Sequence, residues 1–194
     1  MSRLLTSSFS VVLDAHVLYN GPVRDTILRA QDEELFRGYW TAEIVDEALR
    51  NLVEDGRMSR ERAQHLEEEL GYSFPESWVS GYQAYIAMVR NHLKDRHLLA
   101  AAVHAHAQVI VTFNLRHFPA YALAPFGIEA QHPDAFLVHQ YDLESETMVR
   151  IVREQASDGK RPPQTVERLL AVLRTHVPEF ALLVEQGIAE EERC

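Results

Sequence analysis

The feature that most constrains the fold is a helix-to-strand run in the middle of the chain, KDRHLLAAAVHAHAQVIVTFNLRHFP. Small and apolar residues typical of a helix lead directly into VIVT, residues 109–112, a strand that is apolar on both of its faces. Strands of this kind belong to parallel sheets that helices cover on both sides. The run therefore predicts an α/β fold.

The rest of the first 139 residues shows the same alternation. Residues 10–13, in FSVVLDAHVLY, are short and β-branched, which predicts a buried strand. FGIEAQHPDAFL supplies one more short strand and the start of a helix at Pro133. Helices are expected between these strands over residues 21–36, 41–56 (capped by Thr41), 59–71 and 77–89. We expect a parallel-sheet, three-layer α/β domain.

From about Gln140 onward the sequence shows no strand pattern. Three amphipathic helices are expected, separated by SDGKRPP and by Pro178. The sequence thus predicts a domain over residues 1–139 and a small helical appendage over 140–194. The apolar faces of the appendage should pack on the α/β domain or on a partner, through Val149, Val152, Leu169, Leu170 and Leu173.

Composition excludes some classes of protein. The N-terminal MSRLLTSSFS lacks the apolar stretch of a signal peptide or a membrane span, and the single cysteine, Cys194, leaves no internal disulfide. Both facts predict a cytoplasmic protein without a membrane partner. The formal net charge of −10 argues against a large basic surface for nucleic acid. A nucleic-acid substrate would need a local countercharge, such as a divalent cation.

Three oxygen-bearing side chains are expected at one edge of the sheet. Asp14 ends the first strand, Asn114 follows the strand VIVT, and Asp95 opens the helix before that strand. Strand carboxyl ends and helix N-termini share one edge of an open parallel sheet, so the three should converge. Oxygen ligands with open positions suit Mg²⁺ or Mn²⁺. Taken singly, Asp95 could instead cap its helix, and Asp14 and Asn114 could serve turns.

A fourth acid cannot be chosen from periodicity. Glu47 falls well away from the centre of the apolar face of its predicted helix, as a solvated residue would. The helical pattern gives no reason to prefer Glu47 to Glu43 or Asp46.

The chain also resembles a known family. VVLDAHVLY, RDTILRAQDEELFRGYWTAEIVDEALRNL, DRHLLAAAV, VIVTFNLRHFP and GIEAQHPDAFL are similar, in order and spacing, to signatures of PIN-domain nucleases, most closely of the branch that includes VapC-like toxins. The resemblance covers residues 11–137. The helical tail resembles an extension that some members of the branch carry.

The resemblance implies a function and a site. It implies a Mg²⁺- or Mn²⁺-dependent endoribonuclease with an RNA substrate, acting as the toxin of a type II toxin–antitoxin pair with an antitoxin protein as partner; a homodimer is left open. By position, it assigns Asp14, Glu47 and Asp95 as metal ligands and catalytic residues. It also assigns Asn114, in the TFN element that closes the site, as a catalytic residue.

The sequence departs from the family at the rim of this site. The branch commonly has acids near the positions of His92 and His117, and a small polar residue near that of His16. Imidazole at these places could shift the metal preference toward Mn²⁺. We expect His92 and His117 to be exposed loop residues rather than ligands. Arg96, Arg116 and Lys94 are either contacts to RNA phosphates or solvated charges.

These departures keep a second hypothesis open: a PIN-like binding module that has lost turnover and acts in RNA binding or complex assembly. A phosphatase of the haloacid-dehalogenase type is a weaker third hypothesis. It needs a second Asp two residues after the first, where this chain has His16.

Overall fold

The computed structural model describes residues 9–158 and 165–193. The chain start, most of the SDGKRPP linker and Cys194 lie outside the described residues. The rest divides into two compact units. We call residues 9–19 and 36–131 the sheet unit, and residues 20–35, 132–158 and 165–193 the helical unit. No helix among the described residues is long and apolar enough to cross a membrane.

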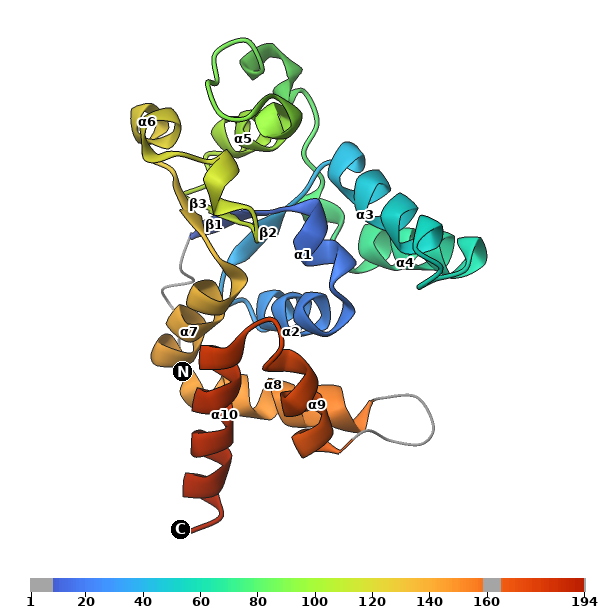
Figure 1. Cartoon of the computed structure of the whole chain (residues 1–194), viewed down its shortest axis with the longest axis vertical. Coiled ribbons are helices and arrows are strands. Elements are labelled where there is room, and N and C mark those ends of the chain that lie inside the picture. The colour runs from blue at the N-terminus through green and yellow to red at the C-terminus, as the bar shows by residue number, and fades with distance from the viewer. Residues whose placement is uncertain (1–8, 159–164, 194) are drawn as a thin grey trace. The chain divides into compact units, whose positions relative to one another are not determined.

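The sheet unit contains a four-stranded parallel sheet in the order β2-β1-β3-β4 (Figure 1). Its strands are β1 (Ser10–Leu13), β2 (Arg37–Tyr39), β3 (Val109–Val111) and β4 (Glu129–Gln131). Every residue of β1 and β3 is buried, as expected for central strands of a covered parallel sheet. The predicted α/β class is confirmed, and β2 is a strand that the sequence pattern did not reveal.

Helices of the sheet unit pack on these strands and on one another. They are α1 (Ala15–Tyr19), α3 (Ala42–Glu54), α4 (Arg60–Ser73), α5 (Arg96–His104) and α6 (Ala120–Leu123). The small residues of α5 let it pack closely on β1 and β3. α3 packs against both α1 and α4 (Figure 1). As predicted, Thr41 caps α3, its side chain accepting from the backbone N–H of Ile44.

Two predicted helices differ from the structure. The segment 77–89 is not an α-helix: it holds only the short 3-10 helix η2 (Tyr82–Tyr85). Gly81, in the left-handed region at φ +82°, breaks the pattern, and Trp78 forms a parallel bridge with Trp40 instead. The helix expected over 21–36 ends at Asp32, because Glu34 adopts φ +60° and turns the chain.

The helical unit is built from α2 (Gly21–Asp32), α7 (Pro133–Leu143), α8 (Ser145–Ser157), α9 (Val166–Leu173) and α10 (Pro178–Glu191). The five apolar residues named for the tail are all buried: Val149, Val152, Leu169, Leu170 and Leu173. They pack among α2, α7, α8, α9 and α10. α2 and α7, which begin before residue 140, thus belong to the same compact unit as the three tail helices.

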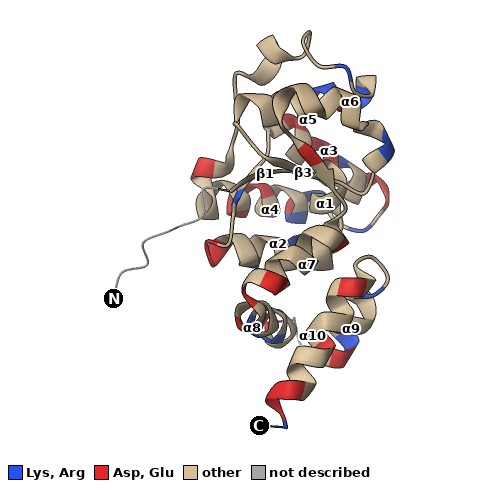
Figure 2. Ribbon diagram, turned by 90° about the vertical axis from the view of Figure 1, so that its left-hand side faces the viewer, with Lys and Arg blue, Asp and Glu red and all other residues tan. Residues whose placement is uncertain are grey.

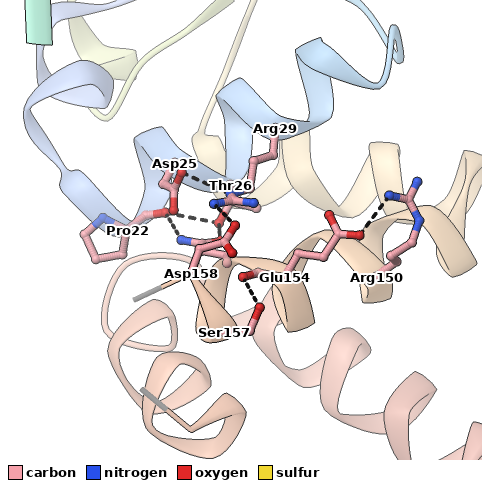
Figure 3. Close-up of polar contacts among 9 residues, drawn as sticks. Pro22, Asp25, Thr26, Arg29, Arg150, Glu154, Ser157 and Asp158 are labelled. Carbon is pink, nitrogen blue, oxygen red and sulfur yellow. Dashed lines mark hydrogen bonds and ion pairs between the residues drawn. The ribbon is translucent and has the colours of Figure 1, made fainter. Parts of the chain in front are cut away.

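A polar seam joins α2 to α8 (Figure 3). The Thr26 hydroxyl lies 2.7 Å from Gln155 Oε1, and Gln155 Nε2 donates to the Pro22 carbonyl at 2.9 Å. Nearer solvent, Arg29 pairs with both Asp25 and Asp158. Because buried polar groups must be paired, these bonds fix how α2 lies on α8.

Candidate metal centre

Asp14 lies where the sheet places it, at the carboxyl end of β1. Its backbone N–H donates to the Val111 carbonyl at 3.1 Å, which continues the pairing of β1 with β3 by one residue. Its own carbonyl accepts from the N–H groups of Val17 and Leu18, in α1. Asp14 therefore joins a strand to a helix, and the residue is only 4% exposed.

The Asp14 carboxylate is held by Thr112, the residue that follows β3. Thr112 Oγ1 donates to Asp14 Oδ2 at 2.5 Å and accepts from the backbone N–H of Asn114 at 2.9 Å. Burial raises the pKa of Asp14, the Thr112 bond and His16 oppose the rise, and the nearby Asp95 carboxylate adds to it. The structure thus brings two acids from distant parts of the chain, Asp14 and Asp95, into electrostatic contact.

Asp95 stands at the start of α5, but its side chain does not cap that helix. Its Oδ2 instead lies 2.8 Å from His117 Nδ1 and 3.4 Å from His92 Nδ1. The two imidazole rings are stacked, with centroids 4.1 Å apart and an interplanar angle of 12°. His92 is exposed as expected, whereas His117 is half-buried and bonded, so it is not a free loop side chain.

Glu47 differs from the neighbouring acids of α3, Glu43 and Asp46, because both of those carboxylates have polar partners. Tyr82 donates to Glu43 at 2.7 Å, and Arg50 pairs with Asp46 at 3.1 Å. Within residues 9–158 and 165–193, the half-buried Glu47 carboxylate has neither a hydrogen-bond nor an ion-pair partner. α3 packs on α1, which begins just after Asp14, but Glu47 itself makes no polar contact with Asp14 or Asp95.

The residues predicted at the rim of the site differ in how exposed they are. Asn114 is half-buried, and its backbone N–H donates to the Thr112 hydroxyl. The Asn114 side chain does not cap the 3-10 helix that follows. Lys94 and Arg116 are exposed. Arg96 is half-buried, and its Nε is buried without a partner in the described part of the chain.

The donor set fits a hard divalent cation. Asp14 is desolvated and lies near a second carboxylate, while its one ion-pair partner in the described chain is the half-exposed His16, with Nδ1 4.0 Å away. Buried carboxylates in proximity need a countercharge. Asp14, Asp95 and the unpartnered Glu47 could supply oxygen ligands of the kind that Mg²⁺ and Mn²⁺ prefer.

Sequence reasoning did not single out Thr112 or Asn91. Thr112 is fully buried and orients Asp14, and the signal available was a hydroxyl residue closing an otherwise apolar strand. Asn91, 4% exposed, donates from Nδ2 to the Asp95 carbonyl at 2.9 Å and so fixes the loop before α5. No sequence pattern marks that contact.

Known proteins match this chain over two separate ranges. A family model described as "PIN domain" matches residues 10–116, and one described as "VapC50 C-terminal domain" matches residues 133–186. The chain is 48% identical over 105 residues to a protein of Mycobacterium tuberculosis named "Putative ribonuclease VapC50". That similarity covers 54% of this chain and 62% of the relative, less than two thirds of its length. No solved structure matches the chain.

Proposed function

Because this chain belongs to the PIN-domain family, we propose that it is a divalent-metal-dependent endoribonuclease. The observation that carries the proposal is the buried Asp14 carboxylate at the carboxyl edge of the sheet, in electrostatic contact with Asp95. Glu47, the acid of α3 without a partner in the described residues, is the proposed third ligand. The name of the M. tuberculosis relative supports the assignment to ribonucleases.

In this proposal the chain's own residues position the reaction. Asp14, Glu47 and Asp95 would hold Mg²⁺ or Mn²⁺, which supplies a nucleophile at neutral pH and relieves charge on the phosphate. Thr112 fixes the Asp14 carboxylate through its 2.5 Å bond and ties the Asn114 backbone to it. Lys94 and Arg116, both exposed, could meet the phosphates of an RNA strand.

We further propose that the protein is the toxin of a type II pair, acts in the cytoplasm and is neutralised by a cognate antitoxin. The resemblance to VapC-like proteins and the match of residues 133–186 to the VapC50 C-terminal model support this. A homodimer belongs to the same proposal, and the molar mass of the purified chain in light scattering tests it.

The direct test is cleavage of a single-stranded RNA by the purified chain, free of any antitoxin. We expect cleavage with Mg²⁺ or Mn²⁺, none with EDTA, and none by the Asp14→Ala protein. Asp14 is a ligand at a strand end, so its loss should leave the circular dichroism spectrum unchanged. Cleavage that survives EDTA would contradict the proposed metal dependence.

Metal binding can be measured separately from cleavage. Calorimetric titration with Mn²⁺ should show tight binding to the wild type and much weaker binding to the Asp14→Asn, Asp95→Asn double variant. Equal affinities would rule out these acids as ligands.

A binding module without turnover is the second candidate function. The bond between His117 and Asp95 favours it, because that bond occupies a carboxylate oxygen that a cation would otherwise use. RNA binding with no cleavage across a broad panel of RNAs would select this candidate.

A further inference from the structure

A second cluster of potential ligands lies beside the proposed nuclease centre. Three residues, His92, Asp95 and His117, each offer one ligand atom, and these atoms all lie within 4.8 Å of one another. His92 caps the 3-10 helix η3 (Leu93–Asp95), and His117 ends the 3-10 helix η4 (Leu115–His117). Two loops that are distant in sequence thus present two imidazoles to one carboxylate.

The backbone holds these two loops together before any ligand arrives. The N–H of His92 donates to the His117 carbonyl at 3.2 Å, and the N–H of Asp95 donates to the His92 carbonyl at 3.0 Å. Asn91 fixes the Asp95 carbonyl. The three side chains therefore need little reorganisation to act together, which favours affinity.

Hydrogen bonding alone does not satisfy this cluster. His117 Nδ1 can donate to Asp95 Oδ2 at 2.8 Å. His92 Nδ1 accepts a long bond of 3.4 Å from the backbone N–H of Lys94, and it also lies 3.4 Å from the same carboxylate oxygen. An Nδ1 that accepts carries no proton to donate to Asp95. Parallel rings 4.1 Å apart cannot bond each other, and two stacked imidazolium ions would repel. A cation between the three atoms would replace the long Lys94 bond as the partner of the His92 lone pair and would neutralise the carboxylate.

An unsatisfied oxygen lies next to the cluster. Asn91 Oδ1 is buried and has no partner in the described chain, although Nδ2 of the same amide is bonded to the Asp95 carbonyl. Buried amide oxygens are usually bonded, so this one is an acceptor still lacking a donor in the described chain. A water carried by a metal ion is a group of the required kind.

The two imidazole nitrogens of this cluster determine which metal ions it should prefer. Imidazole nitrogens suit zinc and other first-row transition metals, whereas Mg²⁺ prefers oxygen and keeps most of its water. Two histidines and one carboxylate with an open fourth position form a known type of zinc site. We propose that His92, Asp95 and His117 bind a transition-metal ion, Zn²⁺ or Co²⁺, in preference to Mg²⁺.

This inference deepens the proposed function, because Asp95 would belong to both sites. Both histidines contact Oδ2 of Asp95. The second carboxylate oxygen could then serve the ion held by Asp14. The transition-metal ion would therefore lie next to the nuclease metal. By withdrawing negative charge from Asp95, it would weaken the attraction of this carboxylate for the nuclease metal. The tests below use metal binding, so they do not depend on whether RNA is cleaved.

Co²⁺ titration of the metal-free full-length chain gives the first test. Four-coordinate Co²⁺ with nitrogen ligands absorbs visible light far more strongly than hydrated Co²⁺, so wild type should develop a visible band. His92→Gln and His117→Gln should each lose the band and bind Zn²⁺ in calorimetry more weakly by at least about tenfold. Asp14→Asn should keep the band.

A matched control comes from another histidine–carboxylate pair. His65 lies 3.2 Å from Glu69 on exposed α4 and has no second histidine beside it. His65→Gln should therefore leave the band and the Zn²⁺ affinity unchanged. A histidine pair with a carboxylate, rather than any exposed imidazole, would then be responsible for the binding.

A ligand exchange keeps the proposal testable if either single variant folds poorly. His92→Asp with His117→Asp replaces nitrogen by oxygen, so the ratio of Zn²⁺ to Mn²⁺ affinity should fall at least about tenfold. A wild type without the band, or a band that persists in both glutamine variants, would overturn the proposal and leave a hydrogen-bonded triad. Absence of RNA cleavage together with a normal band would reject the nuclease function alone.

Discussion

At the scale of single residues, the candidate centre depends on how each acid is neutralised. Asp14 is buried and held by Thr112, Asp95 is engaged by His117, and Glu47 has no polar partner in the described residues. Desolvation makes the charged form of Asp14 costly in the absence of metal. Both the burial of Asp14 and its bond to the Thr112 hydroxyl can be tested by substitution.

Asp14→Asn should stabilise the metal-free protein at neutral pH, because it removes a buried charge. The pKa of the Asp14 carboxyl is raised by burial, so above the raised value the folded state carries a charge that the unfolded state solvates better. The native state binds the proton more tightly, and wild-type stability should therefore fall as pH rises from the ordinary aspartate pKa through the raised one. Urea unfolding in EDTA at several pH values measures this.

Asn is a suitable replacement because its side-chain oxygen can still accept from Thr112. The gain from Asp14→Asn should vanish at pH values below the ordinary aspartate pKa, where both proteins are neutral at this position. A variant that is less stable than wild type in EDTA at pH 7 would show that burial is not the dominant influence on this carboxyl.

Thr112→Val should destabilise the protein by about 1–3 kcal/mol and lower metal affinity. The substitution preserves the shape but removes the one hydroxyl that serves both the Asp14 carboxylate and the Asn114 N–H. Thr112→Ser, which keeps the hydroxyl, should restore the metal affinity. Chemical denaturation and Mn²⁺ calorimetry on both variants measure the two effects, and a failure of Ser to restore affinity would refute the positioning role.

At the scale of elements, the helical unit shows that neighbours in sequence need not be neighbours in packing. α2 lies between β1 and β2 in sequence, yet it packs with α7, α8 and α9. Its buried residues include Val23, Ile27 and Ala30. An independent domain over residues 1–139 thus stays a proposal, since α2 would lose the three tail helices of its own compact unit.

Truncation before Gln140 should give a chain that aggregates or is cleaved by proteases more rapidly than the full chain. It removes α8, α9, α10 and the end of α7, and so exposes the apolar residues of α2, which packs on α7, α8 and α9. Size-exclusion chromatography and limited proteolysis measure the outcome. A monomeric, protease-resistant fragment that still binds Mn²⁺ would instead support the 1–139 domain.

Two leucine substitutions in the tail provide a matched control for packing. Leu173 is fully buried, and Leu182 is 46% exposed. Leu173→Ala should lower the free energy of unfolding by about 2–5 kcal/mol, and Leu182→Ala should cost much less. Similar costs would mean that burial in this unit does not determine its stability.

At the scale of the whole molecule, the net charge of −10 determines how RNA could bind. In the view of Figure 2, segments with Lys or Arg and segments with Asp or Glu both occur in the sheet unit and in the helical unit. A chain with this acidic balance offers few cations to replace the counterions around RNA. Metal bridging, rather than a basic groove, is the mode of binding that this charge favours.

RNA affinity should therefore depend on divalent metal and only weakly on monovalent salt. We expect fluorescence anisotropy of a labelled single-stranded RNA to show binding with Mn²⁺ and little in EDTA at equal ionic strength. The salt slope should be shallow, because few phosphates are neutralised by Lys or Arg. Strong binding in EDTA with a steep salt slope would show that a basic surface, and not the metal, holds the RNA.

The sequence by itself determined the parallel α/β fold and the location of Asp14 and Asp95 at one sheet edge. Both follow from local patterns, namely strands apolar on both faces and the fixed direction of strands and helix N-termini in a parallel sheet. The helical nature of the tail and its buried residues were predictable for the same reason. Segment 77–89 was not, because Gly81 and the bridge of Trp78 to Trp40 override its helical pattern.

Only the tertiary structure decided which side chains meet. It gave partners to Glu43 and Asp46 and left Glu47 without one in the described residues, a difference that helical periodicity cannot express. It also turned the Asp95 side chain from a helix cap into the partner of His92 and His117. These contacts join segments far apart in sequence, so packing and hydrogen bonding across the folded chain determine them, and no local pattern does.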